Sequence, residues 1–217
     1  MRMLKTGIAG FDEFCNGGFP PGVIILYGIP GSGIEVFAQQ VYFNRISMGS
    51  NVTYFSTMKS HDIIKNDMAV YGFEVSTLKE GNCWRFVDGS KSKSVINLIQ
   101  TEMKRGRWVT IDSFSDILLR HDLESGIQLL NTMSFYARKN KGLYFALLTK
   151  GMHNLQVETA MLHFADGVAD FIVSEGTHDS ERKMIIKKMR GTIISSRSLP
   201  FAIEERGITI ETAGRIT

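Results

Sequence analysis

Long apolar runs, cysteine and a strong charge of either sign are all scarce in this sequence. No apolar stretch among its 217 residues reaches the ~18 residues that a membrane-spanning helix needs, so we expect no membrane span. The two cysteines, Cys15 and Cys83, exclude a disulfide framework or a zinc module and favour a cytoplasmic protein with free thiols. Residues 1–14 lack the apolar region of a signal peptide. The net charge of +3 is too small to indicate a nucleic-acid partner by itself.

Patterns for metal binding and nucleophilic catalysis are missing as well. The histidines have no metal-ligand spacing, and neither a Ser/His/Asp pattern nor a nucleophile elbow occurs. We therefore expect no metal site and no serine-type chemistry. The histidines are His61, His121, His153, His163 and His178.

The pattern that is present alternates short apolar runs with amphipathic segments. Such alternation predicts an α/β fold, with a mostly parallel central sheet flanked by helices. The strand-rich tail predicts antiparallel strands at the C-terminal edge. The expected strands are 22–28, 51–57, 107–114, 143–149, 168–175, 182–191, 200–207 and 208–212, and the expected helices are 35–49, 93–106, 125–142 and 157–167.

Residues 26–37, "LYGIPGSGIEVF", have the glycine spacing of a phosphate-binding loop. Gly28 and Gly33 bracket the loop, which contains Gly31 and Ser32 and joins a predicted buried strand to a predicted helix. In that context the backbone N–H groups converge on one point, where the helix dipole also favours an anion. The loop alone is equally compatible with a tight turn that binds no ligand.

The two residues after the loop depart from the phosphate-loop pattern. The pattern continues with Lys and then Ser or Thr, whereas this chain has Ile34 and Glu35. The local charge therefore changes by about two units against a polyanion. Because one unit charge at about 4 Å contributes about 4 kcal/mol at an effective dielectric of about 20, the change could cancel most of a micromolar affinity of about 8 kcal/mol.

Four further segments, taken in order, resemble the KaiC and RadA branch of the RecA-like ATPases. They are the entry segment 6–22 ("TGIAGFDEFCNGGFPPG"), the strand 108–118 ("WVTIDSFSDIL"), the segment 163–173 ("HFADGVADFIV") and the ending 185–210 ("IIKKMRGTIISSRSLPFAIEERGITI"). The resemblance covers nearly the whole chain. It implies a RecA-like P-loop NTPase fold in one KaiC-like domain over 1–217.

The resemblance also implies which residues of the ATPase site have changed. Ile34 stands where the family has its phosphate lysine, and Glu35 where it has the magnesium ligand. Met58 and Lys59 stand where the family has a Glu-Glu pair, the first of which activates water, while Asp112 matches the Walker B aspartate. We therefore expect hydrolysis to be lost and do not expect ATP or magnesium as a cofactor.

These changes suggest that the site holds its own ion pair. If the sites superpose as in the family, Lys59 would meet the carboxylate of Glu35 or of Asp112. The alternative is that Lys59 points into solvent. For Asp112, a cap on the following segment is as plausible as residual metal contact.

Lys188 and Arg190 match a basic pair that, in the family, reaches across a subunit interface to a neighbouring protomer's phosphates. The resemblance thus implies an interface with another chain, either a like subunit or an active relative. A solvated basic strand is the alternative.

The sequence therefore predicts a KaiC-like pseudo-ATPase that acts through protein contacts as a regulatory or assembly subunit. One alternative is a nucleotide-binding sensor or ATPase with a remodelled phosphate site. A lesser alternative is a DNA-binding recombination accessory protein, which would use loops at 120–126 and 150–158. Both loops mix basic with acidic residues, which disfavours binding to the phosphates of a nucleic acid.

Overall fold

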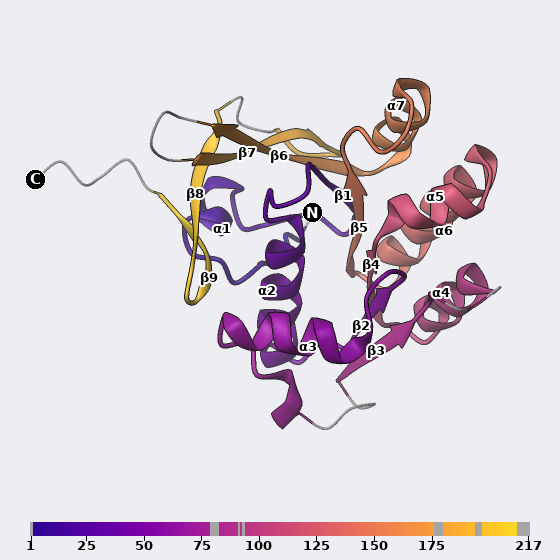
Figure 1. Cartoon of the computed structure of the whole chain (residues 1–217), viewed down its shortest axis with the longest axis horizontal. Coiled ribbons are helices and arrows are strands. Elements are labelled where there is room, and N and C mark those ends of the chain that lie inside the picture. Colours follow the sequence, from indigo (N-terminus) through magenta and orange to yellow (C-terminus); the bar gives the residue numbers. More distant parts are fainter. Residues whose placement is uncertain are drawn as a thin grey trace, which may run out of the picture.

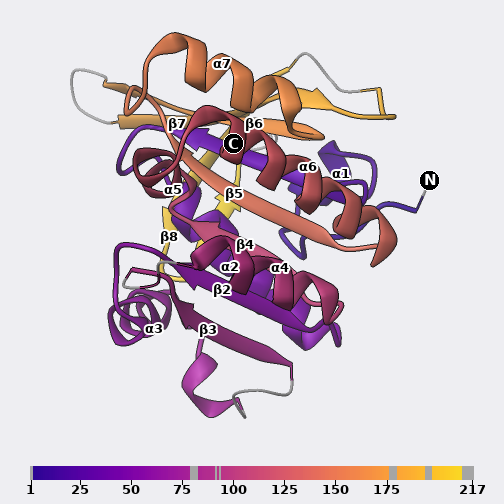
Figure 2. The same cartoon turned by 90° about the vertical axis from the view of Figure 1, so that its right-hand side faces the viewer.

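A nine-stranded sheet runs through the molecule, with helices on both faces (Figures 1 and 2). The computed structural model describes residues 2–78, 83–90, 92, 94–175, 180–193 and 197–211. The strand order is β3-β2-β4-β5-β1-β6-β7-β8-β9. Figure 1 shows α2 on one side of the sheet and α4, α5 and α6 on the other.

The parallel part of the sheet comprises β1 to β6, and the last three strands are antiparallel. The predicted α/β fold, with antiparallel strands at the C-terminal edge, is therefore confirmed. The strands are β1 (Gly22–Gly28), β2 (Val52–Ser56), β3 (Trp84–Asp88), β4 (Trp108–Asp112), β5 (Leu143–Thr149), β6 (Gly167–Glu175), β7 (Ser180–Met189), β8 (Leu199–Glu204) and β9 (Gly207–Ile210).

The helices connect the parallel strands or flank the sheet. They are α1 (Phe11–Phe14), α2 (Ile34–Ser47), α3 (His61–Val70), the 3₁₀ turn η1 (Val75–Thr77), α4 (Val95–Lys104), α5 (Phe114–Arg120), α6 (Leu123–Lys139) and α7 (Leu155–Phe164). No helix of the described residues is long and apolar enough to cross a membrane.

The unit that positions the site is β1, the glycine loop and α2. β1 is central and pairs in parallel with β5 and β6, so its apolar run is buried on both faces. α2 packs Phe37 and Val41 into the core, and the Phe37 ring contacts Phe11 and Phe145 edge-on. This packing fixes the start of α2 at the carboxyl end of β1.

The C-terminal hairpin folds back against α2. The N–H of Ile208 in β9 donates to Gln40 Oε1 at 2.7 Å, and Gln40 Nε2 donates to the Ile208 carbonyl at 3.3 Å. Gly207 lies so close to Gln40 and Phe73 that an added Cβ would be 2.6 Å from the Phe73 ring. The last strands thereby cover α2 beside the candidate site.

The structure differs from the sequence prediction at several elements. The helices α1 and α5 were not predicted, and the strand predicted at 107–114 ends at Asp112. The strand β3 and the helix α3 were not predicted, although both lie beside the site. The loop expected at 120–126 is mostly helical, because α5 ends at Arg120 and the Asp122 carboxylate caps α6. Similarly, α7 begins at Leu155, within the loop expected at 150–158.

Candidate functional site at the carboxyl edge of the sheet

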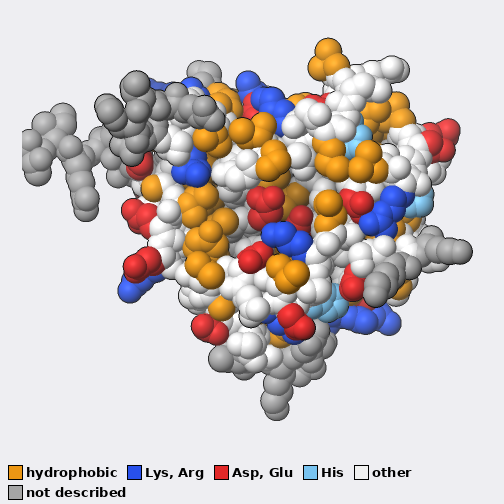
Figure 3. All heavy atoms as spheres, viewed as in Figure 1, with side chains coloured by type: hydrophobic (Ala, Val, Ile, Leu, Met, Phe, Trp, Pro, Cys, Tyr) orange, Lys and Arg blue, Asp and Glu red, His pale blue; other side chains and the backbone are white. Residues whose placement is uncertain are grey.

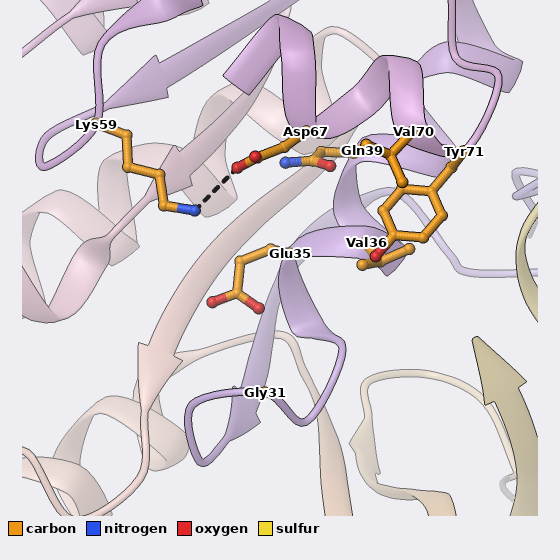
Figure 4. Close-up of a pocket in the computed structure, with 8 residues that line it drawn as sticks. All are labelled: Gly31, Glu35, Val36, Gln39, Lys59, Asp67, Val70 and Tyr71. Atoms are coloured by element: carbon orange, nitrogen blue, oxygen red, sulfur yellow. Dashed lines mark hydrogen bonds and ion pairs between the residues drawn. The ribbon is translucent and has the colours of Figure 1, made fainter. Parts of the chain in front are cut away.

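A cavity of about 310 Å³ lies between the glycine loop, the start of α2 and α3 (Figure 4). The carboxyl ends of β1, β2 and β4 meet at this edge, which is where α/β sheets bind ligands. Figure 3 shows acidic and basic side chains gathered among hydrophobic ones near the centre of this face. The cavity is lined by Gly31, Glu35, Val36, Gln39, Lys59, Asp67, Val70 and Tyr71.

The glycine loop has a tight backbone turn that only glycine adopts easily, and several of its hydrogen-bond donors are free within the described residues. Gly31 and Gly33 have φ of 79° and 97°, a left-handed conformation that side chains disfavour. A Cβ at Gly28 would lie 2.3 Å from Ser32 Oγ, so the strand end also requires glycine. Within the described chain, the buried Ser32 hydroxyl has no hydrogen-bond partner, and no hydrogen bond uses the N–H of Ile34 or Glu35.

The side chains of Ile34 and Glu35 occupy different environments. Ile34 is 2% exposed and belongs to the hydrophobic core, so it contributes packing and no charge. Glu35 is partly exposed, and its carboxylate projects toward the space between Gly31 and Lys59 (Figure 4). In the described part of the chain this carboxylate accepts no hydrogen bond and forms no salt bridge. The carboxylate of Glu35 therefore places a negative charge in the cavity, next to the glycine loop.

Lys59 does not pair with Glu35 or with Asp112, so that prediction is wrong. Its ammonium lies 3.0 Å from the carboxylate of Asp67 on α3 (Figure 4). Partial burial lowers the pKa of Lys59, but the Asp67 hydrogen bond and the charges of Asp67, Asp112 and Glu35 outweigh it, and the pKa is raised. The neighbouring Met58 is 64% exposed. Neither side chain at these two positions can act as a base toward water.

Asp112 lies at the end of β4 and accepts a hydrogen bond from the Tyr54 hydroxyl at 2.7 Å. Burial raises the pKa of Asp112 to about 6; the Tyr54 hydrogen bond opposes the shift, and the charge of Glu35 adds to it. The cap of α5 is Ser113, whose hydroxyl accepts from the N–H of Asp116. Asp112 is thus not the cap that one interpretation of the sequence suggested.

The basic pair on β7 has partners within the chain. Lys188 Nζ donates to the carbonyls of Leu162 and His163 at the end of α7. Arg190 lies 3.4 Å from the Asp166 carboxylate and remains 67% exposed. Lys188 is therefore committed to capping α7, whereas the guanidinium of Arg190 is still accessible.

The site contains more acid than base. Among the described residues that line the cavity, Glu35 and Asp67 are acidic and Lys59 is basic. The charges of Asp112, Asp67 and Glu35 all contribute to the raised pKa of Lys59. Even so, no group of three or more His, Cys, Asp or Glu side chains in the described residues could hold a metal ion. Since Lys59 already pairs with Asp67, the described lining of the cavity keeps the carboxylate of Glu35 as an uncompensated negative charge.

Sequence reasoning missed Asp67 and Tyr54. Asp67 lies in a helix that was not predicted, on the segment "HDIIKNDMAV". Tyr54 meets Asp112 only because β2 and β4 pair in a register that places Ser56 opposite Asp112. The i, i+4 spacing of the apolar residues Ile64 and Met68, which are the buried residues of α3, is a signal that could have revealed the helix.

The whole chain resembles known proteins. Relatives include the UPF0273 proteins of Thermotoga maritima, 27% identical over 97% of this chain and 96% of that protein, and of Pyrococcus horikoshii, 27% identical over 96% and 94%. The circadian clock protein KaiC3 of Synechocystis is 24% identical over 97% of this chain and 46% of its own length.

The fold has a counterpart among solved structures. A KaiC-like protein from Pyrococcus horikoshii superposes with a TM-score of 0.83 at 23% identity, covering 97% of this chain and 99% of that one. The sequence model of the KaiC ATPase family matches residues 4–215. The chain belongs to the KaiC ATPase family.

Proposed function

We propose that this protein is a KaiC-family pseudo-ATPase: it keeps the RecA-like fold, does not hydrolyse nucleotide and acts through contacts with other protein chains. The observation that carries the proposal is the charge at the glycine loop. The unpaired carboxylate of Glu35 lies where the phosphates of a nucleotide would approach, and the lysine nearest to it, Lys59, already pairs with Asp67.

The proposal is also supported by the side chains that stand at the positions of the phosphate cation and of the base. Ile34 is buried and uncharged, so no side chain of the loop neutralises phosphate charge as the transition state forms. Met58 and Lys59 cannot take a proton from water as a carboxylate would. Asp112 still matches the family's aspartate, and its pKa is raised chiefly because its carboxylate is buried.

Equilibrium binding tests the proposal. Titration calorimetry with ATP, with ADP, and with each plus magnesium should show no saturable binding to the wild type up to about 1 mM. The single variant Glu35→Thr removes the unpaired carboxylate and should bind ATP more tightly than the wild type. The variant Gln128→Met, an exposed change on α6, serves as the matched control and should behave as the wild type.

A nucleotide-binding sensor is the second candidate. It is favoured by the buried Ser32 hydroxyl and by the N–H groups of Ile34 and Glu35, which have no partner in the described chain. These donors are the groups that would hold a phosphate. Micromolar binding of ATP by the wild type without any turnover would support the sensor and contradict a permanently empty site.

The protein-contact part of the proposal is supported by exposed apolar side chains on α5, α6 and α7. Leu119, Phe135, Leu155 and Phe164 are 60%, 59%, 81% and 40% exposed. Together with the accessible Arg190, they fit a partner that is a second copy or an active KaiC-like relative. Sedimentation of the chain alone, and mixed with such an ATPase, should reveal a complex that Phe135→Ser with Leu155→Ser weakens.

A further inference from the structure

A second cavity, of about 380 Å³, lies at the amino ends of β1 and β4, whereas the glycine loop lies at the carboxyl end of β1. It is bordered by Pro21, just before β1, by Trp108, which begins β4, and by Arg45 near the end of α2. Its volume is within the usual range for a small-molecule site. Its lining residues are Arg2, Leu4, Pro21, Arg45, Trp108 and Lys141.

Three of these residues are cations, and among the described residues no carboxylate lines the cavity. Arg2 and Lys141 form no salt bridge within the described chain. The Arg45 guanidinium lies 4.4 Å from the centre of the Trp108 ring. Its hydrogen bonds go to neutral acceptors, including Ser50 Oγ at 2.9 Å.

The environment of Arg45 shows that this positive charge is only partly compensated. Burial and the nearby charge of Arg2 lower the pKa of Arg45, and the charge of Asp12 opposes them. The Asp12 carboxylate is already occupied, because it accepts from the N–H and hydroxyl of Thr6 and from the N–H of Gly7. An anion bound in the cavity would supply the missing countercharge.

The remaining walls are apolar and rigid. Leu4 and Trp108 are 8% and 6% exposed, so both are anchored in the core. Leu4 is also held by paired backbone hydrogen bonds with Phe19, at 2.7 and 3.0 Å. Cations beside an apolar wall select a ligand that combines a negative group with an apolar body.

We propose that this cavity binds a small organic anion, whose carboxylate or phosphate lies among Arg2, Arg45 and Lys141 and whose apolar body lies against Leu4, Pro21 and Trp108. The site is separate from the nucleotide edge of the sheet. The proposal that this cavity binds an anion therefore does not depend on whether the protein hydrolyses ATP.

The test uses probes that separate charge from apolar contact. 1-Naphthyl phosphate and 1-naphthoate carry both features, 1-naphthol carries only the apolar body, and inorganic phosphate carries only the charge. Binding is followed by calorimetry and by the ¹H–¹⁵N resonance of the Trp108 indole, which is identified by its loss in Trp108→Phe. Comparing the two anionic probes shows which head group the site prefers.

The matched variants leave the Arg45–Trp108 stack intact. Arg2→Gln with Lys141→Asn removes two cations, and Asn suits the positive φ of 50° at Lys141. Lys104→Gln removes an exposed cation elsewhere. A naphthyl anion should shift the Trp108 resonance, bind at least tenfold more tightly than 1-naphthol or inorganic phosphate, and weaken at least fivefold in the double variant but not in Lys104→Gln. An unmoved Trp108 resonance, or equal affinity in the double variant, would overturn the assignment.

Discussion

The Lys59 ammonium lies 3.0 Å from the Asp67 carboxylate and forms no salt bridge with Glu35 or Asp112. Lys59 is thus held by α3, the next helix along the chain, rather than by a residue across the site. In the part of the chain that the structure describes, neither Glu35 nor Asp112 forms a salt bridge. The negative charge of Glu35 at the glycine loop is therefore not neutralised by a contact with Lys59.

The Lys59→Met variant should lose little stability. Both members of the pair are about half exposed, at 50% and 44%, and exposed ion pairs contribute less than about 1 kcal/mol. Urea unfolding should therefore show a change below about 1 kcal/mol. A loss above about 2 kcal/mol would mean that Lys59 also neutralises Glu35 and Asp112 substantially, contrary to the geometry.

Asp112→Asn should stabilise the protein at neutral pH. The folded pKa of about 6 lies above the ordinary value of 3.8, so the folded state binds the proton more tightly than the unfolded chain does. The wild type therefore loses stability as pH rises from about 4 to 6, by about 3 kcal/mol in all. Asn removes this loss and keeps an acceptor for the Tyr54 hydroxyl.

Unfolding free energies measured from pH 4 to pH 8 check this expectation. The advantage of Asp112→Asn over the wild type should grow between pH 4 and 6 and then stay constant. Asp62→Asn, a change in the exposed first turn of α3, is the control and should show no such growth. An Asp112→Asn difference that does not vary with pH would contradict the raised pKa.

Restoring the phosphate-loop side chains should restore binding but not chemistry. Ile34→Lys with Glu35→Thr replaces a neutral and an anionic group by a cation and a magnesium ligand. Replacing buried Ile34 should cost about 2 kcal/mol, so folding is verified first by circular dichroism. Calorimetry should then detect magnesium-dependent ATP binding, while phosphate release remains at background because Met58 and Lys59 are unchanged. Turnover by this double variant would show that the base lies elsewhere.

Gln40→Met should detach the C-terminal hairpin from α2. The substitution leaves the buried N–H of Ile208 without its acceptor, which costs about 1–3 kcal/mol. Gln128→Met, on the exposed face of α6, is expected to change stability by less than about 0.5 kcal/mol. Equal denaturation midpoints for the two variants would argue against the observed contact between β9 and α2.

The sequence predicted the parts of the fold whose signal is local. β1, the glycine loop and α2 were predicted because a doubly buried run ends in glycines and a periodic helix follows. β3 was missed because Arg85 interrupts its apolar residues and only Trp84 and Phe86 are well buried. The order of the strands, with β1 between β5 and β6, depends on contacts between distant segments, so local sequence patterns could not predict it.

The sequence predicted where the residues of the candidate site lie, but not which residues Lys59 and Asp112 contact. The loop residues, Glu35 and Asp112 lie at one edge of the sheet, as the strand-turn-helix order implied. The partner of Lys59 depends on α3, and that of Asp112 on the register of β2 against β4. Both are contacts between elements, so residue spacing along the chain could not specify them.

Phosphate release from ATP and GTP, with magnesium present, tests the central claim most directly. The wild type and Asp112→Ala should both release phosphate at the rate of a protein-free blank, because Met58 and Lys59 supply no base and Ile34 supplies no cation to the phosphates. Release by the wild type that disappears in Asp112→Ala would contradict the pseudo-ATPase account.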